Sequence, residues 1–155
     1  MGYVRAYQHG DARDLVPLLR IADWQEMLAV SHDDLETRLH EGAEQSAPSC
    51  TIIGNSGLVA GMFGVVPEDH FGRVWMVGSD ELTRPPLSRQ FIRESRHYLA
   101  VMEWPYLAIG NQIDERNALH VHWLQWMGFT FVRRIPSYGV EERPFLEFIK
   151  TCANP

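Results

Sequence analysis

The chain has 155 residues, a net charge of −6 and 45% hydrophobic residues, so one domain over 1–155 with a buried core is expected. No apolar run approaches the roughly 20 residues of a membrane helix, no signal peptide is evident, and the acidic balance argues against general nucleic-acid binding. The two cysteines are too few for a disulfide framework, and no Cys/His cluster has zinc-ligand spacing.

The N-terminal third is predicted to contain one strand and two helices. The strand covers residues 3–7. Asp11 can cap an apolar helical pattern over 11–29, which should be irregular because Pro17 lies inside it. The second helix is predicted over 31–42, capped by its first serine and ended by its glycine.

A three-stranded meander and a long helix are predicted next. Asn55-Ser56-Gly57 is a hairpin signal between the first two strands. The helix over 87–102 has one apolar face and follows a pair of prolines suited to a helix start. The strands are predicted over 50–54, 58–66 and 73–78, with a loop over 79–86.

The C-terminal part alternates strands with one more helix. The predicted segments are a strand over 106–110, a helix over 114–127 and strands over 129–135 and 145–149. The whole order is β-α-α-β-β-β-α-β-α-β-β. Such an order indicates an α/β domain whose mixed central sheet combines a meander with at least one parallel crossover.

The segment from Asn117 to Phe129 passes from a helix through Gly128 directly into a strand. It resembles the closing motif Asn-x-x-Ala-x-x-x-Tyr-x-x-x-Gly-Phe of the GNAT N-acetyltransferases, and the order of elements is similar to that fold over the whole chain. The resemblance implies an acetyl-CoA-dependent enzyme in which the tyrosine commonly serves as general acid. Leu124 stands at that position here.

The same resemblance places the coenzyme A pyrophosphate at the loop before the long helix, where glycines let the backbone approach the phosphates. This loop has no glycine after Gly78, and Pro85 and Pro86 remove two amide donors. We therefore expect no cofactor as the main reading. If acetyl-CoA does bind, the candidate contacts are Arg84, Ser88 and Arg89.

Acetyl transfer to an amine needs a base and an acid. The candidates are His120, which can titrate near neutrality, Asp80 and Glu81 at a strand end, and Tyr138 in a late loop. His122 is expected to face solvent. Glu26 is a further possible base, although it shares a helix face with Asp23 and the pair is interpreted as surface carboxylates in the absence of metal-ligand partners.

A narrower resemblance concerns Val74 to Asp80, the arginine-rich helix and the pattern Asn117-x-x-His120-x-x-x-Leu124-x-x-x-Gly128. These features are similar to the acetyltransferase-like, internal virion protein A family of short-tailed bacteriophages. That resemblance implies a GNAT-like virion or assembly component without efficient catalysis, in the host cytoplasm during assembly or in the virion. Its partners would be other phage structural proteins or a second copy. The alternatives are an acetyl-CoA-dependent N-acetyltransferase acting on a protein or small amine, and a host-directed binding protein.

The helix of the closing motif is apolar on two sides. One stripe can cover the sheet. The other stripe is covered either by the C-terminal strands or by another protein, with tryptophan as anchor. The expected interface residues are Leu119, Trp123 and Trp126, together with Arg93 and Arg96 of the preceding helix.

Overall fold

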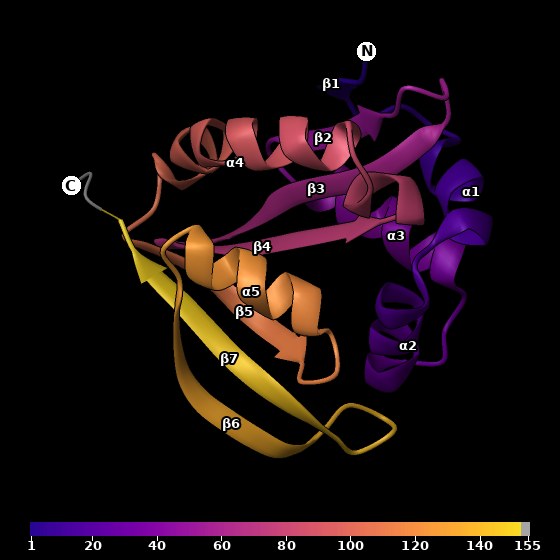
Figure 1. Cartoon of the computed structure of the whole chain (residues 1–155). Coiled ribbons are helices and arrows are strands. Elements are labelled where there is room, and N and C mark those ends of the chain that lie inside the picture. Colours follow the sequence, from indigo (N-terminus) through magenta and orange to yellow (C-terminus); the bar gives the residue numbers. More distant parts are fainter. Residues whose placement is uncertain (153–155) are drawn as a thin grey trace.

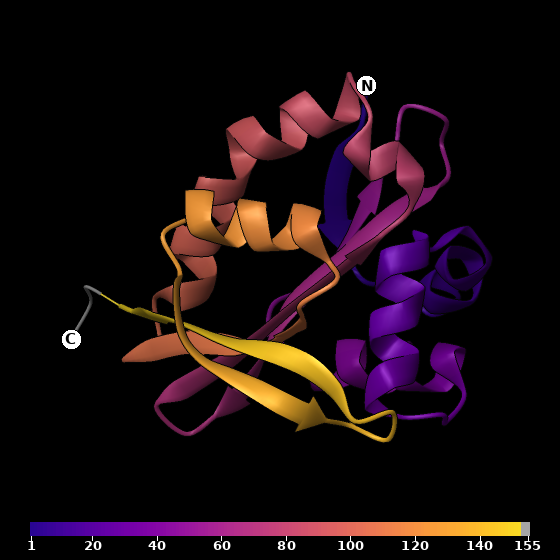
Figure 2. The ribbon, with the colours of Figure 1, turned by 60° about the horizontal axis from the view of Figure 1, so that its bottom comes forward.

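A seven-stranded sheet with the strand order β1-β2-β3-β4-β5-β7-β6 runs through the computed structural model, which describes residues 1–152. The helices α1, α2 and α3 lie on one face of the sheet, and α4 and α5 lie on the other (Figures 1 and 2). The strands are β1 (Tyr3–Ala6), β2 (Ser49–Ile53), β3 (Val59–Glu68), β4 (Phe71–Gly78), β5 (Ala108–Asp114), β6 (Thr130–Tyr138) and β7 (Arg143–Thr151). The helices are α1 (Asp11–Leu15), α2 (Ile21–Val30), α3 (Leu35–Gln45), α4 (Leu87–Glu103) and α5 (Ala118–Trp126), with short 3-10 turns η1 (Val16–Leu18) and η2 (Asp80–Thr83). The predicted mixed α/β class is confirmed.

The predicted helix over 11–29 is divided in two. Pro17 lies in η1, and Leu19 is extended and forms a bridge with Ser79 beside the sheet. The amide of Arg20 then donates to the carbonyl of Gly78 (2.9 Å) before α2 begins. The expected irregularity at the proline is therefore a complete change of direction, which brings the start of α2 against the end of β4.

The next helix, α3, begins and ends later than predicted. Asp34 is its N-cap and accepts a hydrogen bond from the amide of Thr37 (2.9 Å), whereas Ser31 ends α2. Gly42 does not stop α3, which continues to Gln45. Asp34, three residues further on, takes the cap because Ser31 is the C-cap of α2, where its amide donates to the carbonyl of Met27.

The boundaries of the C-terminal elements also differ from those predicted from the sequence. Asn117 precedes the first residue of α5, so the helix starts after a turn and not at Asp114. Tyr138, expected in a loop, is the last residue of β6. These strands are longer than predicted because β7 pairs with β5 on one side and β6 on the other, and the pairing carries strand structure beyond the apolar runs.

The two central strands separate after a short parallel stretch. β4 pairs with β5 only from Phe71 to Arg73, and beyond that point the strands diverge (Figure 1). The side chain of Asn111 marks the point of separation, because its amide donates to the carbonyl of Val74 (2.8 Å) in place of a backbone group. Further along, the facing edges of β4 and β5 have no strand between them.

Hydrophobic clusters cover both faces of the sheet. One includes Leu15, Leu39 and Met62 beneath α1 and α3, and the other includes Leu99 and Trp123 beneath α4 and α5. The gap between β4 and β5 is thus enclosed by helices on both sides.

Candidate active site

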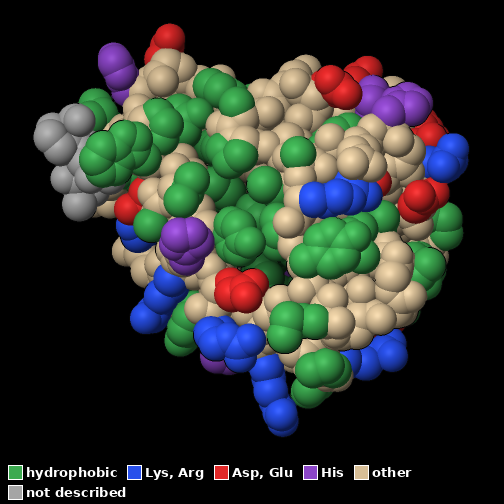
Figure 3. All heavy atoms as spheres, turned by 90° about the horizontal axis from the view of Figure 1, so that it is seen from above, with side chains coloured by type: hydrophobic (Ala, Val, Ile, Leu, Met, Phe, Trp, Pro, Cys, Tyr) green, Lys and Arg blue, Asp and Glu red, His purple; other side chains and the backbone are tan. Residues whose placement is uncertain are grey.

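A cavity of about 470 Å³ fills the gap between the separated strands. Its walls include Met27 and Leu39 from one face of the sheet and Phe91 and Leu124 from the other, so the cavity passes through the sheet. Its size lies in the range of small-molecule sites. Figure 3 views the molecule from above Figure 1, and hydrophobic side chains gather around a hollow in the middle of that face.

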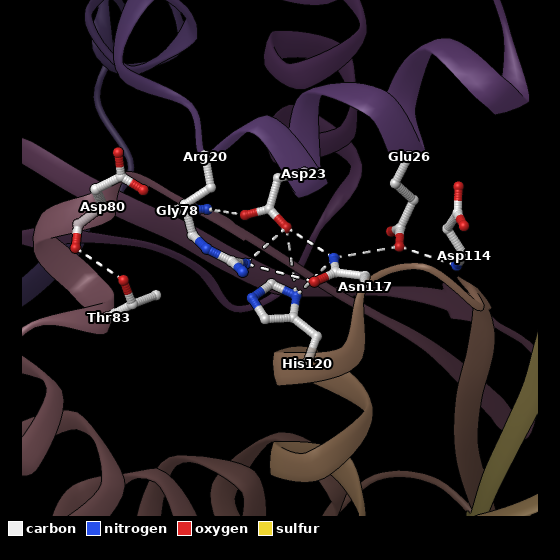
Figure 4. A network of polar contacts seen from close by, with 9 residues as sticks. All are labelled: Arg20, Asp23, Glu26, Gly78, Asp80, Thr83, Asp114, Asn117 and His120. Carbon is white, nitrogen blue, oxygen red and sulfur yellow. Dashed lines mark hydrogen bonds and ion pairs between the residues drawn. The ribbon is translucent and has the colours of Figure 1, made fainter.

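Two carboxylates of α2 tie the ends of the separated strands together (Figure 4). Asp23 accepts a hydrogen bond from the amide of Gly78 at the end of β4 (2.9 Å), and Glu26 accepts one from the amide of Asp114 at the end of β5 (2.9 Å). Asp23 also accepts a hydrogen bond from the side-chain amide of Asn117 (2.9 Å). Because Asp23 is only 1% exposed, it is not the surface carboxylate expected from the sequence.

His120 lies on the wall of the cavity and is 6% exposed. Its Nδ1 is 3.5 Å from Oδ1 of Asp23 and 3.4 Å from Nδ2 of Asn117, while its ring stacks on Trp123 with centroids 5.3 Å apart. Its buried Nε2 has no hydrogen-bond partner among the described residues. Burial lowers the pKa of His120, opposed by the charge of Asp23 and assisted by that of Arg20. The imidazole is therefore neutral at neutral pH. Its Nδ1 lies near both the Asp23 carboxylate, which can accept a proton from it, and the Asn117 amide, which can donate one to it.

Glu26 lines the same cavity. Burial raises the pKa of Glu26 to about 8, and the charge of Asp23 adds to the rise, while the hydrogen bonds from the Asp114 amide and Asn117 act against it. The side chain is thus largely protonated at neutral pH. The cavity wall therefore holds two groups whose pKa values are moved in opposite directions by the same loss of solvent.

The structure separates Asp80 and Glu81 from this cavity. Asp80 is exposed and lies 3.8 Å from Arg84, and its carbonyl accepts from Thr83 (Figure 4). Glu81 accepts from the amide (3.1 Å) and hydroxyl (2.6 Å) of Ser56 and so holds the β2–β3 turn. Neither acid lines the cavity.

Tyr138 does line the cavity, and so does Leu124 at the position of the tyrosine in the closing motif. The Tyr138 hydroxyl donates to Oε1 of Gln112 at 3.4 Å, and its ring packs against Phe145 with centroids 4.6 Å apart. Of the four candidate catalytic residues, His120 and Tyr138 are therefore brought to one cavity.

The candidate phosphate contacts lie at the start of α4, outside the cavity wall. Arg84 and Arg89 are exposed, and Ser88 is buried with its amide donating to the carbonyl of Arg84 (3.0 Å). Pro85 and Pro86 offer no amide hydrogen. Any contact with phosphate at this end of the molecule thus depends on arginine side chains.

The expected interface residues fall into two groups. Trp123 is 9% exposed and packs against Phe91 in the core, so it cannot serve as a surface anchor. Trp126 is 43% exposed, with the guanidinium of Arg96 lying 3.9 Å from its ring centroid. Leu119 is half-buried against the core, and Arg93 is exposed.

Sequence reasoning missed the carboxylate ties of α2, although a signal was present. Asp23 and Glu26 are spaced three residues apart on a largely apolar segment, Ile21 to Val30, in which Gln25 is the other polar residue. Acids on one side of such a helix point at a buried polar partner as readily as at solvent.

Residues 1–152, the part of the chain that the structure describes, contain neither a membrane-spanning helix nor a cluster of metal-binding side chains. No helix in that range is both long and apolar enough to cross a membrane. Nor do His, Cys, Asp and Glu side chains gather there in a group of three or more that could hold a metal ion.

Comparisons with known proteins give a result at the level of the fold. No protein-family model matches the chain, and no curated protein matches it. Solved structures do. An acetyltransferase of the GNAT family from Streptococcus pneumoniae superimposes with a TM-score of 0.65 at 15% identity, covering 99% of this chain and 100% of that one. Ard1 from Thermoplasma volcanium gives a TM-score of 0.70 at 14% identity, covering 99% of both chains.

A third structure, spermidine N-acetyltransferase from Vibrio cholerae in complex with CoA and spermine, gives a TM-score of 0.65 at 15% identity. It covers 97% of this chain and 95% of that chain. The fold expected from the Asn117 to Phe129 motif is thereby confirmed, and the narrower phage resemblance receives no support. The chain has the fold of the GNAT acetyltransferases.

Proposed function

We propose that this protein transfers an acetyl group from acetyl-CoA to an amine. The observation that carries the proposal concerns buried His120 on the wall of a cavity that passes between β4 and β5: its Nε2 has no hydrogen-bond partner within residues 1–152. A buried polar atom without a partner is costly unless something else satisfies it. The similar solved structures are acetyltransferases and favour this function over the structural role expected first from the sequence.

The roles of the residues follow from their surroundings. Neutral His120 can accept a proton from the attacking amine at Nε2, and Asp23 beside Nδ1 stabilises the imidazolium that results. The held proton can then be released toward the leaving thiolate, a role that Leu124 cannot fill. The balanced reaction forms one C–N bond, breaks one C–S bond and moves one proton from nitrogen to sulfur.

The cavity fits the thioester end of acetyl-CoA, which would supply an activated acyl group. Beyond Arg73 the edges of β4 and β5 are not paired with each other, so their backbone groups can pair with the amides of an extended chain. Arg84 and Arg89 remain the candidate contacts for the phosphates. This replaces the expectation of no cofactor.

The test uses the intact chain. Calorimetry should detect acetyl-CoA binding, and thiol release should follow acetyl transfer to a panel of primary amines. His120→Gln should lower kcat by about 100-fold or more. His122→Gln is the matched control, because His122 lies on the same helix, is exposed and does not line the cavity. Absence of both acetyl-CoA binding and thiol release would contradict the proposal.

A second candidate function is binding to another protein, including a role in phage assembly or in the host. It is favoured by the glycine-free loop before α4 and by exposed Trp126. Trp126→Ser should then weaken a complex that copurifies with the chain and leave acetyl-CoA binding unchanged. A chain that stays monomeric and binds no phage protein would count against it.

A further inference from the structure

We infer that the acceptor amine also carries a carboxylate, which Arg38 binds at the end of the cavity between α2 and α3. The inference rests on the proposed function for the identity of the reacting group. The anion site itself rests on independent contacts.

Arg38 is held in place but not saturated. Its Nη1 donates to the carbonyls of Met27 (2.7 Å) and Ser31 (2.7 Å) at the end of α2. Its Nε and Nη2 make no hydrogen bond with residues 1–152, although the side chain is half-buried and lines the cavity. Two donors of a rigid fork are thus left for a ligand, and a carboxylate matches that fork.

The charge of Arg38 is also not compensated. No ion pair joins it to any acid among the described residues, and burial lowers its pKa against the weaker effect of Asp33. Arg73, the other arginine of the cavity, is already paired with Glu68 (3.0 Å). With Glu26 protonated and His120 neutral at neutral pH, the wall carries a net positive charge that attracts an anion.

Much of the cavity wall is apolar. Its side chains include Met27 and Val30 of α2, Leu39 of α3, Trp75 of β4 and Phe145 of β7. A ring or a branched apolar body buries its surface there. The acceptor class is therefore a primary amine joined to a carboxylate through an apolar, ring-sized body.

A matched pair of probes tests this class directly. 4-(Aminomethyl)benzoate carries the amine, the ring and the carboxylate, and 4-(aminomethyl)benzamide differs only in having no charge. Calorimetry without acetyl-CoA should give at least about tenfold tighter binding of the acid. Thiol release with acetyl-CoA should show a lower KM for the acid.

Variants then assign the difference to Arg38. Arg38→Gln should remove the preference for the acid, and Arg38→Lys should retain part of it. Arg13→Gln is the control, since that side chain is 68% exposed and lies outside the cavity wall. Because Arg38 also caps α2, the comparison of the two probes on the unmodified chain decides the question if a variant fails to fold.

The outcomes separate the two proposals. Equal binding of acid and amide, or no binding of either at millimolar concentrations, overturns the carboxylate site. Acetyl transfer without preference for the acid leaves the proposed function standing and overturns this inference. Preferred binding of the acid without any acetyl transfer leaves the carboxylate site standing and counts against the proposed function.

Discussion

At the scale of single residues, the protonation of Glu26 and His120 is set by their surroundings. Both lose solvent in the same cavity, so the acid keeps its proton and the base loses its own. For Glu26 the hydrogen bonds from the Asp114 amide and Asn117 oppose this rise of the pKa without reversing it, and the nearby charge of Asp23 reinforces it. Glu26 and His120 are thus both uncharged at neutral pH, which suits an amine that must react in its uncharged form.

Glu26 gives a prediction about stability and pH. The folded chain holds this proton up to pH about 8, whereas an unfolded glutamate releases it near 4.5. Between these values the folded state binds more protons, so the free energy of unfolding should fall as pH rises, by at most about 1.4 kcal/mol per pH unit. Denaturant unfolding between about pH 7.5 and 8 reduces the opposite contribution of His120, because an unfolded histidine binds its proton with a pKa of about 6.5.

Glu26→Gln should flatten that slope, because glutamine stays neutral and still accepts from the Asp114 amide. The control is Glu36→Gln, an exposed acid in the first turn of α3, which should keep the slope of the unmodified chain. An unchanged slope in Glu26→Gln would show that this carboxyl is ionised at neutral pH.

At the scale of elements, α5 has one buried side and one exposed side. Trp123 packs against Phe91 and His120, whereas Trp126 lies beneath the guanidinium of Arg96 and stacks on no aromatic ring within residues 1–152. The two tryptophans, three residues apart, therefore belong to different environments. The second apolar stripe predicted for this helix is thus divided, because Trp123 is buried in the core and Trp126 is 43% exposed.

Truncating each tryptophan should separate these roles. Trp123→Ala should lower the free energy of unfolding by about 3 to 5 kcal/mol, the usual cost of removing a large core side chain. Trp126→Ala should cost about 1 kcal/mol or less, since an exposed cation–π contact is weak. Similar losses for both, measured by chemical denaturation, would contradict this division.

At the scale of the whole molecule, α2 bridges the ends of the separated strands β4 and β5 through hydrogen bonds to Asp23 and Glu26. Asp23 accepts hydrogen bonds from the amide of Gly78 in β4 and from the side chain of Asn117, the N-cap of α5. It also forms an ion pair with Arg20 (3.2 Å). The cavity therefore depends on one buried carboxylate that joins three parts of the fold.

Removing that carboxylate should affect stability and local opening together. Asp23→Ala leaves Arg20 and the Gly78 amide without their partner and should cost about 3 kcal/mol. Hydrogen exchange at the Gly78 amide should become faster. Asp14→Ala is the control, because Asp14 is 53% exposed on α1, and it should change stability by no more than about 0.5 kcal/mol. Equal effects would show that Asp23 does not tie the strands.

Much of the fold could be predicted from local patterns. The meander, the long helix and the passage from α5 into β6 follow apolar periodicity and turn residues, which act over a few positions. The predicted element boundaries were wrong where pairing between strands decided them, as in β6 and β7. They were also wrong where Asp34, and not Ser31, is the N-cap of α3.

The site was less predictable because its contacts cross the chain. Asn117 and Asp23 meet across 94 positions, and Glu26 meets Asp114 across 88. No local pattern specifies such partners. His120 was a candidate by residue type, and only its burial and unpartnered Nε2 distinguish it from His122.

The sequence by itself determined the α/β class, the order of the elements and the absence of a tyrosine at Leu124, since these depend on neighbours along the chain. The tertiary structure alone decided which acids are buried, which histidine faces the cavity and that Arg38 keeps two donors without a partner among residues 1–152. Those properties arise from solvent exclusion between elements that meet only when the chain folds.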